Sequence, residues 1–220
     1  MEDISAPKKN PRSSPIPPEW LPAGTDRAYV RLAGADEVGR GSGAGPFLAA
    51  SVEIPSGIEI PPDLGDSKGF DPRGRRIAYL AAWVEEHCLI TQAWYSVEEI
   101  DSLGIGEVNV AAFERIILTN GADFTLVDGN LKLRTHKLGD RVNAYRCETK
   151  AERFAPVAAA SIWAKVTRDR VMAQIAQAHP GYGLEAAGYL TPAAIEAIRI
   201  RGRIPGVHRM SYRIAALGEK

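Results

Sequence analysis

Two periods of apolar and polar residues alternate along the chain and predict an α/β fold. Runs rich in apolar and β-branched residues predict strands at 29–35, 47–54, 89–97, 124–127 and 142–147. Apolar residues spaced three and four positions apart predict helices at 71–86, 108–118, 156–178 and 192–200. This order of elements is typical of a central mixed sheet flanked by helices, here with a small helical carboxy-terminal region.

The amino-terminal end differs in composition from the rest of the chain. Residues 1–26 contain six of the fifteen prolines and too little apolar surface to offset the entropy cost of ordering. We therefore predict a disordered, proline-rich extension over 1–27. The remaining residues, 28–220, are long enough to bury one core and are predicted to form a single domain.

Composition and cysteine usage favour a cytoplasmic monomer. The chain is 45% hydrophobic and 25% charged, which is ordinary for a globular protein. No apolar run is long enough to span a membrane, and the amino terminus lacks the pattern of a secretory signal. Cys88 and Cys147 have no metal-ligand spacing and are interpreted as reduced thiols of a cytosolic protein.

Charge is distributed unevenly although the formal net charge is zero. Residues 1–129 hold 11 Lys and Arg against 20 Asp and Glu, whereas residues 130–220 hold 16 against 7. The two parts are therefore net −9 and net +9. Such asymmetry indicates a surface that binds a polyanion, and scattered solvated charges are the alternative.

Acidic residues stand at the ends of two predicted strands. Asp36 and Glu37 lie between the first strand and a glycine-rich run, 39–46. Neighbouring acids inside a strand point to opposite faces, but past its end both carboxylates can turn toward one centre. Asp128 follows the strand at 124–127, on the rim of the sheet where ligands bind in α/β folds. The alternatives are an exposed acidic turn for the pair and a turn-forming aspartate at position 128.

Glu148 and Glu152 are two further acidic candidates, just before the long buried helix, although each alone is typical of a solvated acid. Hard divalent cations prefer oxygen ligands, and Mg²⁺ typically takes one or two carboxylates together with phosphate oxygens and water. Without metal, clustered carboxylates repel one another and raise at least one pKa. Such a cluster lowers stability, which favours a functional interpretation.

Several segments resemble, in order, the signatures of the type 2 ribonucleases H, a family made of ribonuclease HII and its sister ribonuclease HIII. The resemblance extends from about residue 29 to residue 213. Its segments are 34–41 (Gly-Ala-Asp-Glu-Val-Gly-Arg-Gly), 44–46 (Ala-Gly-Pro), 66–68 (Asp-Ser-Lys), 126–130 (Leu-Val-Asp-Gly-Asn), 159–170 (Ala-Ala-Ser-Ile-Trp-Ala-Lys-Val-Thr-Arg-Asp-Arg), 188–189 (Gly-Tyr), and Gly202 and Pro205 followed by 208–212 (His-Arg-Met-Ser-Tyr).

This resemblance implies a ribonuclease H-like domain that cuts the RNA strand of RNA/DNA hybrids, or cuts at a ribonucleotide embedded in duplex DNA, and leaves 5′-phosphomonoesters. It also implies two Mg²⁺ or Mn²⁺ ions held by four acids. Asp36, Glu37 and Asp128 match three of these acids. Counting back from the helix signature places the fourth acid of the HII branch at Ala151, which cannot bind metal. Glu152 is therefore expected to be the fourth ligand, with Glu148 in reserve.

The resemblance also implies substrate contacts. Gly39, Arg40 and Gly41 match the segment that reads the 2′-hydroxyl of a ribose, and glycine allows the close backbone approach that this requires. Tyr189 matches the tyrosine that packs on the adjacent deoxyribose. Lys68 matches a phosphate contact. A tight structural turn and a core aromatic are the alternatives for the glycines and for the tyrosine.

Lys165 is a second candidate phosphate contact, and it can also extend from its helix simply to reach water. The segment 184–187 (Leu-Glu-Ala-Ala) lacks the basic and histidine residues common there in the family, which predicts weaker substrate affinity or junction preference. Two alternative functions remain. They are a hybrid-binding protein with impaired catalysis, and an HIII-like enzyme that cuts long hybrids only. The extension is too short and too proline-rich for the folded one of HIII proteins, so HII-like specificity is expected.

Overall fold

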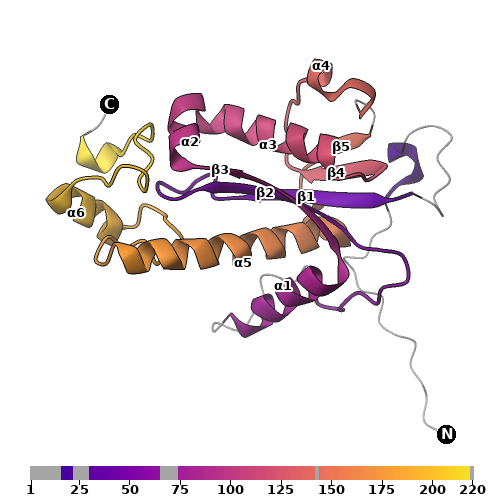
Figure 1. Cartoon of the computed structure of the whole chain (residues 1–220), viewed down its shortest axis with the longest axis horizontal. Helices are drawn as coiled ribbons and strands as arrows, with labels where there is room; N and C mark the ends of the chain where they lie inside the picture. The colour runs from indigo at the N-terminus through magenta and orange to yellow at the C-terminus, as the bar shows by residue number, and fades with distance from the viewer. Residues whose placement is uncertain (1–15, 22–29, 65–73, 142–143, 219–220) are drawn as a thin grey trace, which may run out of the picture.

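The computed structural model describes residues 16–21, 30–64, 74–141 and 144–218. Figure 1 shows a sheet covered by helices on both faces, with the carboxy-terminal segment at one end of the molecule. In chain order the elements are η1 (Pro18–Trp20), β1 (Leu32–Val38), β2 (Phe47–Glu53), α1 (Arg75–His87), β3 (Leu89–Tyr95), α2 (Val97–Leu103), α3 (Ile105–Thr119), β4 (Phe124–Asp128), α4 (Thr135–Leu138), η3 (Gly139–Arg141), β5 (Tyr145–Glu148), η4 (Ala151–Arg153), α5 (Ala155–Ala178), α6 (Pro192–Arg201) and η5 (Ala215–Leu217).

The sheet is mixed, with the strand order β3-β2-β1-β4-β5. Strand β1 runs antiparallel to β2, and β2 runs antiparallel to β3, whereas β1, β4 and β5 are parallel to one another. The predicted mixed α/β fold is therefore confirmed. Because β1 and β4 are adjacent and parallel, their carboxyl ends lie side by side at one edge of the sheet.

Two hydrophobic clusters lie on the two faces of the sheet. Helices α2 and α3 cover one face, and α5 and α1 cover the other (Figure 1). The α3 cluster includes Phe47, Phe113 and Val127, and the α5 cluster includes Leu48 and Trp163. Neighbouring positions of a strand thus enter opposite clusters, as the two-residue period of a β-strand requires.

Helix α5 packs against β1 at very short range. A Cβ added at Gly34 would lie 2.1 Å from the backbone nitrogen of Val157 and 2.3 Å from the carbonyl carbon of Pro156. No side chain larger than hydrogen fits between these two backbones. The first half of α5 is rich in buried alanine, including Ala159 and Ala160, and this lets the helix lie close along the sheet.

Several of the predicted boundaries differ from the structure, among them those of β1, β3 and β5. Strand β1 ends at Val38, so Asp36 and Glu37 lie inside the strand and not beyond it, because β2 pairs with both of them. Strand β3 ends at Tyr95, two residues before the predicted end. Helix α2 begins there, because Ser96 and Glu99 form a reciprocal capping box that starts a helix. The predicted strand at 142–147 is observed as β5, and residues 142 and 143 lie outside the described residues.

Residues 16–21 of the predicted extension are ordered, so the prediction of disorder is wrong for them. Ile16 is buried, and Trp20 and Leu21 pack with it against the cluster that contains Phe124 and Phe154. These apolar side chains supply the contact area that the proline-rich composition conceals. The rest of the predicted extension lies outside the described residues.

Helix α5 is the longest element, with 24 residues. Among the residues that the structure describes, no helix combines the length and the apolar character needed to cross a membrane.

We predict that Gly34→Ala destabilises the protein by about 3 kcal/mol or more, because the added methyl group overlaps backbone atoms that cannot rotate away. Urea denaturation of the purified variant measures this loss. Gly106→Ala is the matched control, because a Cβ at Gly106 in α3 meets nothing within 4 Å. Alanine there is expected to stabilise the helix by roughly 0.5–1 kcal/mol. Equal stability of Gly34→Ala and the parent would contradict the close packing of α5 on β1.

Candidate active site

Two of the predicted acids lie on the same side of neighbouring strands. The register pairs Ala35 of β1 with Val127 of β4. Asp36 and Asp128 are the next residues of the two strands, so they also lie side by side. Asp36 also pairs with Ala50, which belongs to the cluster under α5, so its side chain faces α5. The two aspartates therefore stand on the α5 face at the carboxyl edge of the central strands.

Glu37 occupies the opposite face of β1. It pairs with Ala49, which belongs to the cluster under α3. Both residues lie inside β1 and not past its end as predicted, yet the charge of Asp128 acts on Glu37 as well as on Asp36. Their charges still act on each other, since repulsion from Glu37 contributes to the raised pKa of Asp36.

The three acids are held in an environment that disfavours their ionised forms. Burial raises the pKa of Asp36 to about 7, and the charges of Glu37 and Asp128 add to this effect. A hydrogen bond from Ser161 of α5 and one from the Glu37 amide, 2.8 Å from Oδ1, act in the opposite direction. Burial also raises the pKa of Glu37 and of Asp128. None of the three forms an ion pair with a described basic residue. The charges of Arg40 on Glu37 and of Arg153 on Asp128 offset only part of the effect of burial.

The turn after β5 brings Glu152, the predicted fourth acid, near Asp128. The Ala151 amide donates a hydrogen bond to Asp128 Oδ1 at 2.7 Å, and the charge of Glu152 contributes to the raised pKa of Asp128. Lys150 has φ +60° and ψ +36°, a left-handed conformation that costs a residue with a side chain about 1–2 kcal/mol. The surrounding contacts, rather than the local preference of the chain, therefore hold this turn in place.

Glu148 and Glu152 have different surroundings. Glu148 is paired with Arg146 at 3.3 Å and with Arg153 at 3.4 Å. Glu152 is exposed on η4 and forms no hydrogen bond or ion pair with any residue that the structure describes. Glu148 is thus already neutralised by two cations, whereas the Glu152 carboxylate is available to a ligand.

The glycine-rich loop between β1 and β2 is held from below by two buried arginines. Arg168 of α5 donates to the carbonyl oxygens of Pro46, Ala44 and Ala187 at 2.8, 3.0 and 2.9 Å. Burial, with Arg209 nearby, lowers the pKa of Arg168 to about 10, so it remains charged at neutral pH. Its hydrogen bonds go to carbonyl oxygens of loops, and it forms no ion pair with an acid in the described chain.

Arg209 holds the same loop from the carboxy-terminal side. Its Nε and Nη2 donate to the Gly45 carbonyl at 3.0 and 2.9 Å, and Nη1 donates to the Tyr212 hydroxyl at 2.9 Å. The Tyr212 hydroxyl in turn donates to the Arg40 carbonyl at 2.6 Å. The loop is therefore fixed to both α5 and the carboxy-terminal region. Sequence reasoning assigned no role to these arginines, although both stand in segments that resemble the family.

The fold requires glycine at position 39 of the loop but not at position 41. Gly39 has φ +89°, and a Cβ there would lie 2.3 Å from Nε of Arg168, so the fold itself requires glycine. Gly41 has no positive φ, and the nearest atom to an added Cβ is Cε1 of Tyr189 at 3.9 Å. The space beside the Gly41 Cα is therefore not filled by any other described part of the protein.

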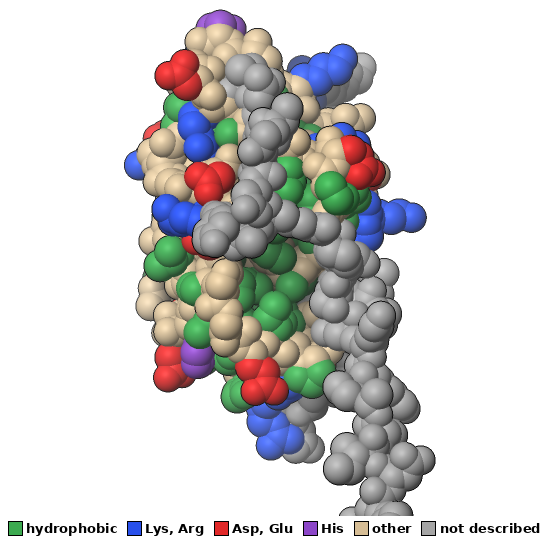
Figure 2. Space-filling view, turned by 90° about the vertical axis from the view of Figure 1, so that its right-hand side faces the viewer, with side chains coloured by type: hydrophobic (Ala, Val, Ile, Leu, Met, Phe, Trp, Pro, Cys, Tyr) green, Lys and Arg blue, Asp and Glu red, His purple; other side chains and the backbone are tan. Residues whose placement is uncertain are grey.

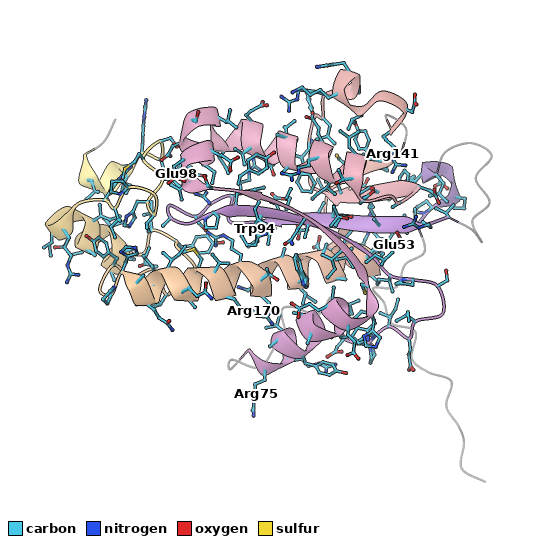
Figure 3. The ribbon with its side chains drawn as sticks, viewed as in Figure 1. Glu53, Arg75, Trp94, Glu98, Arg141 and Arg170 are labelled. Atoms are coloured by element: carbon cyan, nitrogen blue, oxygen red, sulfur yellow. The ribbon has the colours of Figure 1, made fainter. Side chains whose placement is uncertain are left out.

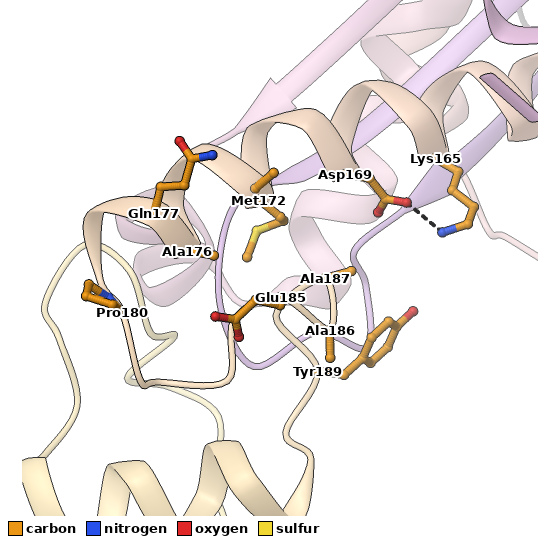
Figure 4. A pocket seen from close by; sticks show the side chains of 11 residues that line it. Lys165, Asp169, Met172, Ala176, Gln177, Pro180, Glu185, Ala186, Ala187 and Tyr189 are labelled. Atoms are coloured by element: carbon orange, nitrogen blue, oxygen red, sulfur yellow. Dashed lines mark hydrogen bonds and ion pairs between the residues drawn. The ribbon is translucent and has the colours of Figure 1, made fainter. Parts of the chain in front are cut away.

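Tyr189 stands at the mouth of a groove beside this space. The ring is 51% exposed, so the alternative of a core aromatic is wrong. Figure 4 shows the groove between α5 and the loop that carries Tyr189, with Glu185 on its rim. Lys165 also lines it, but its ammonium is paired with Asp169 at 2.7 Å. Glu185 is the only charge of the divergent segment 184–187, and it adds negative charge beside Tyr189.

Arg40 is exposed next to the acids, and its guanidinium forms no ion pair with a described residue. Its charge lowers the pKa of Glu37, against the larger effect of burial. Lys68, the other predicted phosphate contact, lies outside the described residues. The structure thus places Asp36 and Asp128 on neighbouring strands, with Glu152 near enough to affect the pKa of Asp128, and it places Tyr189 beside Gly41.

Some basic residues of the carboxy-terminal half are paired with acids. Arg170 lies between α5 and α1, where it pairs with Glu85 at 2.9 Å (Figure 3). Arg134 pairs with Glu114 at 2.5 Å. Figure 2 shows the end of the molecule at the start of β1, where basic and acidic side chains are interspersed around apolar ones on the described surface. Part of the positive charge is therefore balanced locally.

A mixed five-stranded sheet with aspartates on two adjacent parallel strands is the arrangement that the resemblance to the ribonuclease H-like class predicts. Residues 33–215 match the family model described as Ribonuclease HII. Ribonuclease HII of Ruegeria pomeroyi is 40% identical over 190 residues, which cover 85% of this chain and 78% of that protein. The chain belongs to the ribonuclease HII family. It is accordingly an endoribonuclease that acts on RNA/DNA hybrids and depends on divalent metal.

Solved structures agree with this fold. A chain of the PCNA:RNase HII complex from Archaeoglobus fulgidus superposes with a TM-score of 0.70 at 27% identity, covering 84% of this chain and 96% of that chain. Bst-RNase HIII in complex with Mn²⁺ superposes with a TM-score of 0.61 at 19% identity, covering 83% and 67% of the two chains. The second likeness shows the fold alone.

The raised pKa of Asp36 predicts a pH-dependent stability of the metal-free protein. Because the pKa of about 7 lies above the ordinary value, Asp36 lowers stability as pH rises toward and through 7. Asp36→Asn removes this effect, so its stability advantage over the parent should grow by about 2 kcal/mol between pH 5 and pH 8. Urea denaturation in EDTA at both pH values measures the difference. An advantage that stays constant with pH would show that Asp36 ionises normally.

Proposed function

We propose that the chain hydrolyses the RNA strand of RNA/DNA hybrids and also cuts at single ribonucleotides in duplex DNA, with Asp36, Glu37, Asp128 and Glu152 as the acids that hold two divalent metal ions. The observation that carries this proposal is the pair of partly buried carboxylates, Asp36 and Asp128, on the α5 face of β1 and β4, whose pKa values are raised by burial and which form no ion pair with a described residue. Buried carboxylates without a cation are costly, and a divalent cation relieves that cost.

The donor set fits Mg²⁺ or Mn²⁺. All four side chains are oxygen ligands, which hard cations prefer. Among the described residues, no three acidic, histidine or cysteine side chains converge closely enough to hold a metal by themselves. Mg²⁺ sites are commonly built from one or two carboxylates and completed by water and substrate phosphate oxygens. When bound, such ions activate the attacking water and stabilise the leaving oxygen.

The side chains of the site have distinct parts in this reaction. Asp36 and Asp128 present their carboxylates on the α5 face, where Ser161 and the Ala151 amide orient them. Glu37 adds its negative charge from the neighbouring position of β1. Since the pKa of Asp36 is about 7, this carboxyl must lose a proton at neutral pH before it holds a cation.

Substrate recognition falls to the glycine-rich loop and Tyr189. The space at Gly41 allows a ribose to approach the backbone, and the 2′-hydroxyl is the group that distinguishes RNA from DNA. The exposed ring of Tyr189 beside it offers a flat surface for the adjacent sugar. Gly39 and Arg40 complete the segment, the first by its backbone conformation and the second by an exposed cation.

We predict that Gly41→Ala lowers cleavage at a single ribonucleotide by about tenfold or more, because its methyl group occupies the space meant for the ribose. Thermal unfolding should be unchanged, since the new Cβ is 3.9 Å from its nearest neighbour. Gly39→Ala is the contrasting variant, because its Cβ meets Arg168 and it should destabilise the fold. Unimpaired cleavage by Gly41→Ala would remove the proposed role of the loop.

The fourth ligand is assigned by comparing two matched variants. We predict that Glu152→Gln reduces the cleavage rate by about a hundredfold or more, because it removes a charge that the metal site uses. Glu148→Gln should keep most of the activity and lose stability instead, since Glu148 pairs with Arg146 and Arg153. Loss of activity in Glu148→Gln alone would transfer the role to Glu148.

The test of the function itself uses two substrates with Mg²⁺ or Mn²⁺. One is a DNA duplex with one ribonucleotide, and the other is a long RNA/DNA hybrid. Cleavage of both, leaving 5′-phosphates, is the expected result. Cleavage of the long hybrid only would indicate HIII-like specificity, and binding without any cleavage would indicate an impaired enzyme. The proposal extends to a cytoplasmic monomer, supported by Cys88 and Cys147, which are both free thiols.

A further inference from the structure

The amino-terminal segment packs against the turn that carries Glu152. Ile16 is buried, and Trp20 and Leu21 cover a cluster formed by β4, η4 and the start of α5. The turn η1 lies beside β4 and β5 at the end of the sheet opposite the carboxy-terminal region (Figure 1). The first described residues of the chain are therefore neighbours of the candidate metal site.

Trp20 closes a ring of contacts around this turn. The indole of Trp20 meets the phenyl ring of Phe154 edge-on, with centroids 5.8 Å apart. The Arg146 guanidinium lies over the indole, 4.1 Å from its centroid. Arg146 pairs with Glu148 at 3.3 Å, and Glu148 pairs with Arg153 at 3.4 Å. The Arg153 guanidinium then lies 4.7 Å from the ring of Phe154. Four of these five side chains belong to β5, the turn and α5, and Trp20 is the only one from a distant part of the chain.

The conformation of the η4 turn is stabilised by contacts with the side chains around it. Lys150 is left-handed, which an L-residue with a side chain adopts only when the surroundings impose it. Arg153 donates to the carbonyl oxygens of Thr149 and Lys150 at 3.1 and 2.9 Å, so the ring acts directly on the strained residue. Glu152 stands between Ala151 and Arg153 and forms no hydrogen bond or ion pair with a described residue. Its place relative to Asp128 is therefore set by the turn.

We infer that Trp20 is a positioning residue of the active site, which holds the η4 turn so that Glu152 faces Asp128. This inference rests on the proposed metal-binding role of Glu152. It gives the proline-rich amino-terminal segment a part in catalysis. Trp20 touches neither substrate nor metal, and acts through Arg146 and Phe154.

The test measures Mn²⁺ binding by titration calorimetry on the full chain without substrate, together with the Mn²⁺ concentration that gives half-maximal cleavage. Trp20→Ala should lower the Mn²⁺ affinity about tenfold and raise the Mn²⁺ concentration for half-maximal cleavage about tenfold. This is the lower end of the effect of removing a group that supports a metal ligand. Trp20→Phe keeps a ring between Arg146 and Phe154 and should restore affinity close to that of the parent. Tyr182→Ala is the matched control, because Tyr182 is also an aromatic ring under an arginine, Arg201, but packs in the carboxy-terminal cluster.

A double mutant separates positioning from general stability. If Trp20 acts through Glu152, then Trp20→Ala causes no further loss of Mn²⁺ affinity in a Glu152→Gln protein. The same tenfold loss in both backgrounds would overturn the inference, as would a loss of thermal stability with unchanged Mn²⁺ affinity, the pattern expected of Tyr182→Ala. If Glu152→Gln alone leaves Mn²⁺ binding unchanged, the proposed role of Glu152 fails, and the inference fails with it. Normal binding by Trp20→Ala beside impaired Glu152→Gln overturns the inference only.

Discussion

The contact between α5 and β1 at Gly34 is the constraint on which the rest of the structure depends. Because the two backbones touch there, the helix can lie along the sheet in only one register. That register places Ser161 beside Asp36 and, two turns further on, Arg168 under the glycine-rich loop. At its other end it places Phe154 and the η4 turn next to Asp128. One backbone contact thus aligns the acids, their hydrogen-bond donors and the support of the loop.

The two ends of the site are stabilised by different means. The loop at 39–46 is held by buried guanidinium groups that donate to carbonyl oxygens, contacts that a change of pH near neutrality leaves intact. The η4 turn is held by exposed and half-buried ion pairs and by aromatic contacts, each of which is individually weak. The recognition side of the site is consequently the rigid side, and the position of the last acid depends on several weak contacts acting together.

Much of the fold could be predicted from the sequence, because strands and helices of this chain bury one face each and so show their periods. Asp36 and Asp128 could be found for the same reason, since each stands where an apolar run ends. Helix α2 could not be found from periodicity, as the apolar run of β3 continues to Val97, although the capping box at Ser96 and Glu99 was a sufficient signal. The packing of Trp20 could not be predicted, because the overall composition of residues 1–26 gives little weight to their few apolar side chains.

The buried arginines could not be predicted from residue spacing. Their partners are carbonyl oxygens from loops that are far away in the sequence, and such partners have no side-chain signature. The same holds for the choice between Glu148 and Glu152. It depends on Arg146 and Arg153, whose pairing follows from the geometry of β5 and η4 and not from any pattern in the chain.

The inward hydrogen bonds of the glycine-rich loop have a consequence for its outer surface. The carbonyl oxygens of Arg40, Gly43, Ala44, Gly45 and Pro46 all accept hydrogen bonds from within the protein. The amides of Arg40 and Gly41 have no hydrogen-bond partner among the described residues, so they are N–H donors that the loop offers to its surroundings. Such a surface attracts the oxygen atoms of sugars and phosphates through fixed dipoles. Its electropositive character neither titrates nor moves, and no single surface substitution removes it.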